Sequence, residues 1–167
     1  MKIKSSRGFS LIEVIIVLAI VAIAASVAAP NFNSFRQNTN LKEAARDISS
    51  DIYLCRQRAV SENRGYRINF SIAANTYTIQ QETVVNNTRT GNYVALTTKT
   101  VGAGNANIII YNTPAPPSFT GGVSYVTFNP RGTSGAGSLT LQHTKRLSTA
   151  TITINAMGRA NVSYVLK

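Results

Sequence analysis

The chain has 167 residues, a formal net charge of +11 and a composition in which 44% of residues are hydrophobic. This length predicts one modest globular domain beside any anchor, and it is long enough to bury a core. The lone cysteine, Cys55, excludes an internal disulfide, and the lone histidine, His143, excludes a histidine cluster for a metal.

The first 29 residues combine a basic leader with a long apolar run. Residues 1–8 carry three basic residues and no acid, and they end at Gly8. Residues 9–29 would span roughly 31 Å as a helix at about 1.5 Å per residue, which matches a bilayer core of about 30 Å. Their lone charge is Glu13, and a carboxylate in such a helix costs on the order of 3 kcal/mol. These features predict a transmembrane helix that keeps Glu13 for a specific contact.

The stretch Arg7-Gly8-Phe9-Ser10-Leu11-Ile12-Glu13 closely resembles the N-terminal signature of type IV pilins and type II secretion pseudopilins. The resemblance implies that residues 1–8 are a prepilin leader, that a prepilin peptidase cuts after Gly8, and that Phe9 is then methylated. It also implies that Glu13 pairs with the N-terminal amine of a neighbouring subunit. Such a pair inside an apolar bundle would relieve the desolvation of both charges and set the stagger between helices.

Two simpler interpretations fit the N-terminus less well. A secretory signal peptide has an apolar core of about 7–15 residues before a small-residue cleavage site, which Ala28-Ala29 could mimic, but the run here is longer. A plain membrane anchor explains the length and leaves the spacing of Gly8, Phe9 and Glu13 to chance. The spacing therefore favours the pilin-type interpretation.

Residues 30–63 are expected to form the amphipathic half of the helix. Pro30 lacks a backbone donor, so we expect a kink or short break there, whereas the resemblance implies one continuous, gently bent helix. Asn63 and Gly65 offer a stop signal. Apolar residues at spacings of three and four form one stripe: Leu41, Ala44, Ala45, Ile48, Ile52, Cys55 and Ala59. This stripe predicts a helix face packed on a sheet, with Cys55 as a buried structural thiol.

Residues 64–167 show the period-two pattern of a β-rich domain. Polar residues 83–92 predict a loop, and the proline- and glycine-containing residues 114–122 predict a segment that cannot join a sheet interior. The expected strands are 68–72 and 77–79 as a hairpin, then 93–101, 108–111, 123–128, 139–141, 150–154 and 161–166.

Residues of the C-terminal half indicate which family within the pilins and pseudopilins the chain resembles. Three stretches are similar to the GspH/FimT family of minor pilins and pseudopilins: Phe128-Asn129-Pro130-Arg131-Gly132, Thr151-Ile152-Thr153-Ile154 and Gly158-Arg159. The helix residues Arg56-Gln57-Arg58-Ala59 also fit that family. The resemblance implies an α+β, pilin-like fold in which a long N-terminal helix, half membrane-embedded and half amphipathic, packs on two small antiparallel β-sheets.

Charge is distributed unevenly along the chain. The last acidic residue is Glu82, and residues 83–167 contain seven Lys or Arg. This asymmetry indicates an anionic partner, or else a surface that keeps the protein soluble or matches an acidic neighbouring subunit. Candidate anion or DNA contacts are Arg131, Lys145, Arg146, Arg159 and Lys167.

Structural roles are the alternative for two of these arginines: Arg131 could fix a turn by bonding carbonyls, and Arg159 could make a cross-strand contact. Some FimT proteins bind DNA during natural transformation through a C-terminal Gly-Arg-x-Arg motif. The matching positions here read Gly158-Arg159-Ala160-Asn161, so Asn161 can hydrogen-bond a phosphate but brings no charge.

No arrangement in the sequence is typical of an enzyme. All acids lie at or before Glu82, so spacing gives no support for a Ser-His-Asp site around His143. The stretch Gly102-Ala103-Gly104 lacks the lysine and strand-to-helix setting of a phosphate loop. We expect no catalytic site, cofactor or metal.

The residues and the resemblance together predict a minor pilin or pseudopilin. It would be a single-pass inner-membrane protein with a periplasmic domain, and it would enter a type II secretion pseudopilus or a type IV pilus in filament priming or tip assembly. Expected partners are other pilin or pseudopilin subunits, the prepilin peptidase and the inner membrane. The alternatives are a FimT-like DNA-binding minor pilin and a membrane-anchored binding protein that never polymerises.

Overall fold

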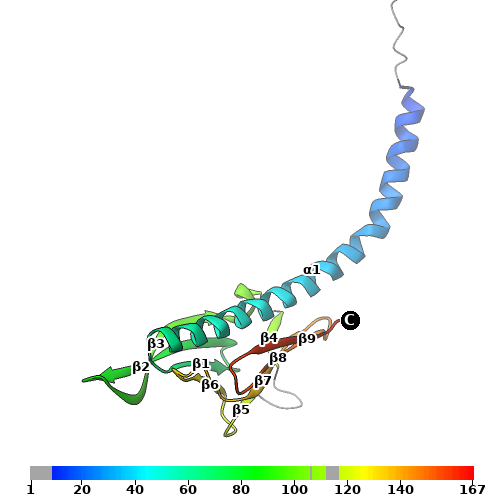
Figure 1. Ribbon diagram of the computed structural model, residues 1–167. Coiled ribbons are helices and arrows are strands. Elements are labelled where there is room, and N and C mark those ends of the chain that lie inside the picture. Colours follow the sequence, from blue (N-terminus) through cyan, green and yellow to red (C-terminus); the bar gives the residue numbers. More distant parts are fainter. Residues whose placement is uncertain (1–8, 106, 112–116) are drawn as a thin grey trace, which may run out of the picture. The chain divides into compact units, whose positions relative to one another are not determined.

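The computed structural model describes residues 9–105, 107–111 and 117–167, and its fold is α+β, as predicted (Figure 1). The chain forms two compact units, Met1–Gln37 and Asn38–Lys167. The helix α1 (Leu11–Ser61) and the 3₁₀ turn η1 (Val101–Gly104) accompany the following strands: β1 (Tyr66–Ser71), β2 (Thr76–Val85), β3 (Thr88–Thr100), β4 (Ile108–Ile110), β5 (Ser118–Phe119), β6 (Tyr125–Phe128), β7 (Gly137–His143), β8 (Thr149–Ile154) and β9 (Ala160–Val165).

In the first unit, α1 begins directly after Ser10, whose carbonyl oxygen accepts hydrogen bonds from the amides of Glu13 and Val14 at 3.1 and 3.3 Å. Of the kink or short break expected at Pro30, the break is wrong, because the described helix continues through this residue, as the resemblance implied. Proline removes only one backbone donor, and the hydrogen bonds of the flanking turns are sufficient to keep the chain helical. The predicted leader, residues 1–8, lies outside the described residues.

In the second unit, the apolar stripe of α1 is buried as predicted. Its seven members, from Leu41 to Ala59, are at most 2% exposed and belong to one core with side chains from both sheets. The helix ends at Ser61, and Asn63 follows in the left-handed region with φ 51°. The amide of Arg64 donates to the carbonyl of Ala59 at 3.2 Å, which satisfies one of the terminal carbonyls. The stop signal in the sequence is therefore confirmed.

Two antiparallel sheets face this half of α1 (Figure 1). The first has the strand order β3-β2-β1-β6, and the second has the order β4-β7-β8-β9, with β5 pairing the first residues of β7. Strands β3 and β9 are therefore edge strands. The two-residue β5 lies on the same edge of β7 as β4, which agrees with a segment excluded from the sheet interior. Pro114 and Pro116 lie outside the described residues.

The loop predicted for residues 83–92 is wrong, because these residues continue β2 and begin β3. Val85 pairs with Thr88 across a tight turn at Asn86 and Asn87, whose φ angles are 49° and 61°. Asparagine tolerates this left-handed conformation, and paired left-handed residues match the twist of a hairpin. The segment looked like a loop because β3 is exposed along most of its length, so it needs no alternating apolar residues.

Candidate functional site

Phe9 and Glu13 lie close together at the start of α1. Phe9 lies two residues before the first helical residue, Leu11, and is 83% exposed, and Glu13 lies in the first helical turn. Both residues line one open hollow with the apolar side chains Val14, Val17 and Leu18. A carboxylate in the first turn also complements the helix dipole, so a local role accompanies any role in assembly. Gly8 lies outside the described residues.

The following helical turns are apolar on every side. The large hydrophobic side chains between Leu11 and Ile23 are 47% to 81% exposed. A helix of this kind needs an apolar surrounding, such as lipid or neighbouring helices, to cover it. Across the described residues, no helix is both long enough and apolar enough to cross a membrane.

The five predicted anion-binding residues fall into two groups at opposite ends of β8. Lys145 and Arg146 lie in the turn before β8, and Arg146 Nε donates to the carbonyl oxygen of Lys167 at 2.7 Å. Arg159 lies in the turn after β8, and Arg131 lies in the turn after β6. The six residues of β8 span about 17 Å at roughly 3.4 Å per residue, so the two groups do not form one continuous row of cations.

The turns that carry Arg131 and Arg159 are joined through Ser134. Its amide donates to the carbonyl of Ala156 at 3.0 Å, and its hydroxyl donates to the carbonyl of Asn155 at 3.0 Å. Both arginines are exposed. The structure therefore brings these two predicted residues into neighbouring turns.

Arg56 is a residue in this region whose role the sequence did not indicate. Its Nε donates to the carbonyl oxygen of Gly132 at 3.1 Å, and thereby ties α1 to the turn after β6. Gly158 is left-handed, with φ 68°, and any side chain there would press against Arg56 and the Gly132 carbonyl. The turn-fixing role considered for Arg131 thus belongs to Arg56. The two bonded residues are 76 positions apart, so no local pattern reveals the contact.

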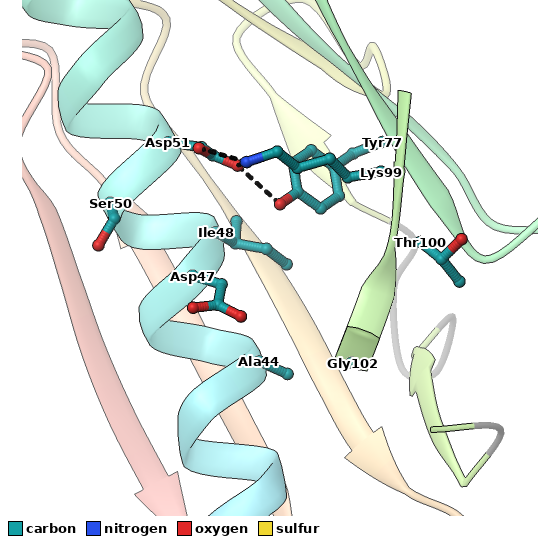
Figure 2. A pocket seen from close by; sticks show the side chains of 9 residues that line it. All are labelled: Ala44, Asp47, Ile48, Ser50, Asp51, Tyr77, Lys99, Thr100 and Gly102. Carbon is teal, nitrogen blue, oxygen red and sulfur yellow. Dashed lines mark hydrogen bonds and ion pairs between the residues drawn. The ribbon is translucent and has the colours of Figure 1, made fainter. Parts of the chain in front are cut away.

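On the other side of α1, the buried Asp51 forms a polar cluster with the buried Tyr77 and the partly exposed Lys99 (Figure 2). Asp51 is 6% exposed, and it accepts a hydrogen bond from the Tyr77 hydroxyl at 2.7 Å. Lys99 Nζ donates to its two carboxylate oxygens at 2.9 and 2.7 Å. Burial and the hydrogen bond to Asp51 raise the pKa of Tyr77. The cluster borders an open hollow of about 710 Å³, and its charges are already paired, as in a structural contact.

The described residues include no cluster of three or more histidine, cysteine or acidic side chains suited to a metal. Cys55 is buried, as predicted, and burial raises the pKa of its thiol to about 12. A thiol that stays protonated at neutral pH is a poor nucleophile.

Comparison with known families identifies the chain. Residues 44–158 match the family model described as type II transport protein GspH, and residues 3–29 match the prokaryotic N-terminal methylation motif. The chain belongs to the GspH family, within the superfamily of type IV pilins and pseudopilins. The motif and the family are those of membrane-anchored pilus or pseudopilus subunits, which are structural proteins.

Individual relatives agree with this family. The type IV major pilin protein PilA of Myxococcus xanthus is 38% identical over 61 residues, which cover 36% of this chain and only 27% of that protein. The fold is similar to type IV minor pilin FimU of Pseudomonas aeruginosa (TM-score 0.54, 16% identity, 77% of this chain and 92% of that one). It is equally similar to minor pseudopilin EpsH from the type 2 secretion system of Vibrio cholerae (TM-score 0.54, 10% identity, 76% and 97%).

Proposed function

We propose that this chain is a minor pilin or pseudopilin, a structural subunit that enters a type II secretion pseudopilus or a type IV pilus. The observation that carries the proposal is the presence in one chain of an N-terminal methylation motif over residues 3–29 and a GspH-family domain over residues 44–158. Its role is assembly, in filament priming or at the tip, and we expect no catalytic activity.

The proposal includes processing and anchoring of the N-terminus. A prepilin peptidase would cut after Gly8 and methylate Phe9, and residues 9–29 would cross the inner membrane once and later enter the filament core. The exposed apolar side chains of the first helical turns support this, since they need lipid or packed helices around them. The globular domain would face the periplasm.

Glu13 would pair with the N-terminal amine of a neighbouring subunit. Its position in the first turn, beside Phe9 in the same apolar hollow, supports a charge held at the end of the helix for a partner. An unpaired charge in an apolar bundle is costly, so each group would favour the subunit stagger that brings the two together.

Filament preparations test the proposal. In cells that make the filament, mass spectrometry should find a mature chain that begins at methylated Phe9. Replacement Glu13→Gln should lower recovery of the chain in sheared filaments at least tenfold, whereas the control Glu62→Gln, in the globular unit, should leave recovery unchanged. Normal assembly of Glu13→Gln, or a chain that is never found in filaments, would refute the proposal; the latter result would favour a membrane-anchored binding protein.

The comparisons do not favour the DNA-binding alternative. A titration of the full-length chain in detergent with double-stranded DNA, over a salt series, would detect it. Salt-sensitive binding that is lost in Arg159→Ala and Lys145→Ala would establish a DNA-capturing subunit, since phosphate contacts weaken steeply as salt rises.

A further inference from the structure

The turn between β7 and β8 and the residues after β9 form one surface of the Asn38–Lys167 unit. Arg146 Nε donates to the carbonyl oxygen of Lys167 at 2.7 Å, and the amide of Lys167 donates to the hydroxyl oxygen of Ser148 at 2.9 Å. Apart from the half-buried Arg146, the members of this surface are exposed. We call it the basic–apolar patch, and its members are Lys145, Arg146, Leu147, Leu166 and Lys167.

The cations of the basic–apolar patch have no acidic side chain as a partner among the described residues. The ion pairs of the described chain involve other residues. Arg146 gives only its Nε to the Lys167 carbonyl, so its two Nη groups keep their donors for another acceptor. The acidic residues of this unit all lie within residues 43–82, and the first of them, Glu43, lines a separate hollow with Gly102 and Asn105. The patch therefore offers unpaired positive charge.

Leu147 holds an apolar side chain out of the fold. Its φ angle is 58°, in the left-handed region that residues other than glycine and asparagine rarely adopt, and it is 52% exposed. Its amide donates to the carbonyl of His143 at 2.8 Å, so the turn itself fixes this conformation. Asparagine would suit both the backbone and contact with water better than leucine. The stability of the fold therefore does not account for Leu147, whereas an apolar surrounding beside the turn would.

The basic–apolar patch is bonded to the residue at which this unit begins. The Ser148 hydroxyl donates to Asn38 Oδ1 at 3.0 Å, and Asn38 Nδ2 donates to the carbonyl oxygen of Lys167 at 3.5 Å. Only the helical residues 30–37 separate Asn38 from the proposed membrane segment. They rise about 12 Å, and the headgroup layer of a bilayer is itself about 5–7 Å deep. The charges of a lipid surface act over about 8–10 Å, so they reach this end of the unit.

We infer that the basic–apolar patch docks on the anionic surface of the membrane that anchors the chain. Lys145, Lys167 and the Nη groups of Arg146 would contact lipid phosphates, which fit the planar donor fork of arginine. Leu147 and Leu166 would lie among the headgroups, as apolar side chains of interfacial segments do. Docking would hold the globular unit in one orientation on the membrane until the chain enters a filament.

The strength of this contact depends on the anchor. A few cations attract an anionic surface only modestly, but an anchored chain keeps its patch at high local concentration beside the lipid. The inference therefore rests on the proposed function for its membrane segment. It adds a lipid-binding surface on the globular unit, which the anchor alone does not require.

The exposed leucines favour a lipid surface over double-stranded DNA. A duplex offers phosphates to the cations, but it offers no apolar layer to Leu147 and Leu166. Arg131 and Arg159 lie at the other end of β8, so the patch is a short cluster of cations and not a row that follows a duplex. Mobile headgroups gather around a cluster of cations, so a lipid surface needs no such row.

Fluorescence quenching of the full-length chain in vesicles tests the inference. Thr144→Cys, exposed beside the patch, carries a bimane label, and native Cys55 is buried and stays unlabelled. The neutral quencher acrylamide should quench this label several-fold less in vesicles of equal parts phosphatidylglycerol and phosphatidylcholine than in vesicles of phosphatidylcholine alone. High salt should reduce the difference. The same label at Asn69→Cys, exposed on β1, should be quenched equally in both.

Substitutions then identify the groups that make the contact. Lys145→Gln with Arg146→Gln should abolish the difference between the two kinds of vesicle. The matched control Arg58→Gln with Arg64→Gln removes the same charge near the end of α1 and should keep the difference. Leu147→Asn suits the left-handed backbone, so it should fold normally and still lower the protection of the label.

Equal quenching in both kinds of vesicle, or protection that survives Lys145→Gln with Arg146→Gln, would overturn the inference. Protection by double-stranded DNA but not by phosphatidylglycerol would also overturn it, and would assign the patch to nucleic acid. Failure of this docking while Glu13→Gln still lowers filament recovery would overturn the inference alone and leave the proposed function intact. A chain that alkaline carbonate extracts from every vesicle would contradict the proposed anchor as well.

Discussion

At the scale of single residues, the buried polar side chains of Asp51 and His143 differ in whether all of their polar atoms are hydrogen-bonded. Both oxygens of Asp51 receive hydrogen bonds from Lys99, and one also receives the Tyr77 hydroxyl. His143 is 1% exposed, and its Nδ1 has no partner among the described residues. Burial lowers the pKa of His143, and the nearby positive charges of Lys145 and Arg146 lower it further, because each disfavours the protonated imidazole. His143 is therefore expected to stay neutral at physiological pH.

This predicts a loss of stability in mild acid. Below pH 6.5 the imidazole of the unfolded chain binds a proton, whereas the imidazole of the folded chain stays neutral. The free energy of unfolding is therefore unaffected by His143 above pH 6.5 and decreases as pH falls below it. The loss is at most about 1.4 kcal/mol per pH unit for one proton. Thermal unfolding of the full-length chain in detergent, followed by the near-ultraviolet signal of its tyrosines, measures the effect between pH 7.5 and 5.5.

Replacement His143→Gln supplies the control for this prediction, because glutamine does not titrate. The variant should show a flatter dependence of the unfolding midpoint on pH over the same interval, whatever its stability at pH 7.5. An equally steep dependence in the variant would assign the acid sensitivity to other groups.

At the scale of elements, Glu82 fastens the β2–β3 hairpin to the rest of the domain. It accepts hydrogen bonds from the Gly65 amide at 2.9 Å, the Gly91 amide at 3.0 Å and Arg89 Nε at 2.6 Å. Burial would raise the pKa of Glu82, but these donors outweigh burial and lower it. One carboxylate thus joins the chain that follows α1, the strand β2 and the start of β3.

Replacement Glu82→Gln should lower the free energy of unfolding by about 1–3 kcal/mol, because an amide cannot accept all three bonds and leaves a buried donor unsatisfied. Urea unfolding measures this change, and hydrogen exchange should show faster exchange at Gly65 and Gly91. Since the folded pKa is lowered, the contribution of Glu82 is present above its ordinary pKa of 4.5 and is lost as pH falls below it. Unchanged exchange at both glycines would contradict the assigned role.

The elements differ in how far the sequence alone could predict them. The stripe from Leu41 to Ala59 follows the helical period because one face of α1 is buried and the other is not. The start of β3 was not predicted, because it has no buried face that would set a pattern in its sequence. As an edge strand exposed on both faces, it is held by backbone pairing with β2, and pairing leaves no period in the side chains.

At the scale of the whole molecule, the hydrophobic core formed by the described residues lies within the Asn38–Lys167 unit. Every buried member of the hydrophobic core, from Leu41 to Ile154, belongs to this unit, and both sheets contribute. We therefore predict that residues 38–167, produced alone, fold cooperatively and unfold within about 4 °C of the full-length chain, a difference worth about 1 kcal/mol for a domain of this size.

All seven tyrosines lie in this unit, so near-ultraviolet circular dichroism reports its folding in both proteins. A control that also deletes residues 38–48 removes four members of the buried stripe and should not fold. Loss of cooperative unfolding in the 38–167 protein itself would show that the first unit is required for the fold.

The sequence by itself determined the features that depend on local order. The spacing of Gly8, Phe9 and Glu13, the apolar run after them and the buried stripe of α1 are all visible as patterns of neighbouring residues. The family resemblance followed from such patterns, and the match to the GspH family confirmed it.

Only the tertiary structure decided which distant charges meet. It separated Arg159 from Arg146 by the length of β8, joined Arg56 to Gly132, and paired Asp51 with Lys99. These arrangements depend on strand order and on the packing of α1 across two sheets, where contacts form between residues many positions apart. Local periodicity shows which face of an element is buried, whereas the neighbours of that face are set by the long-range pairing of strands.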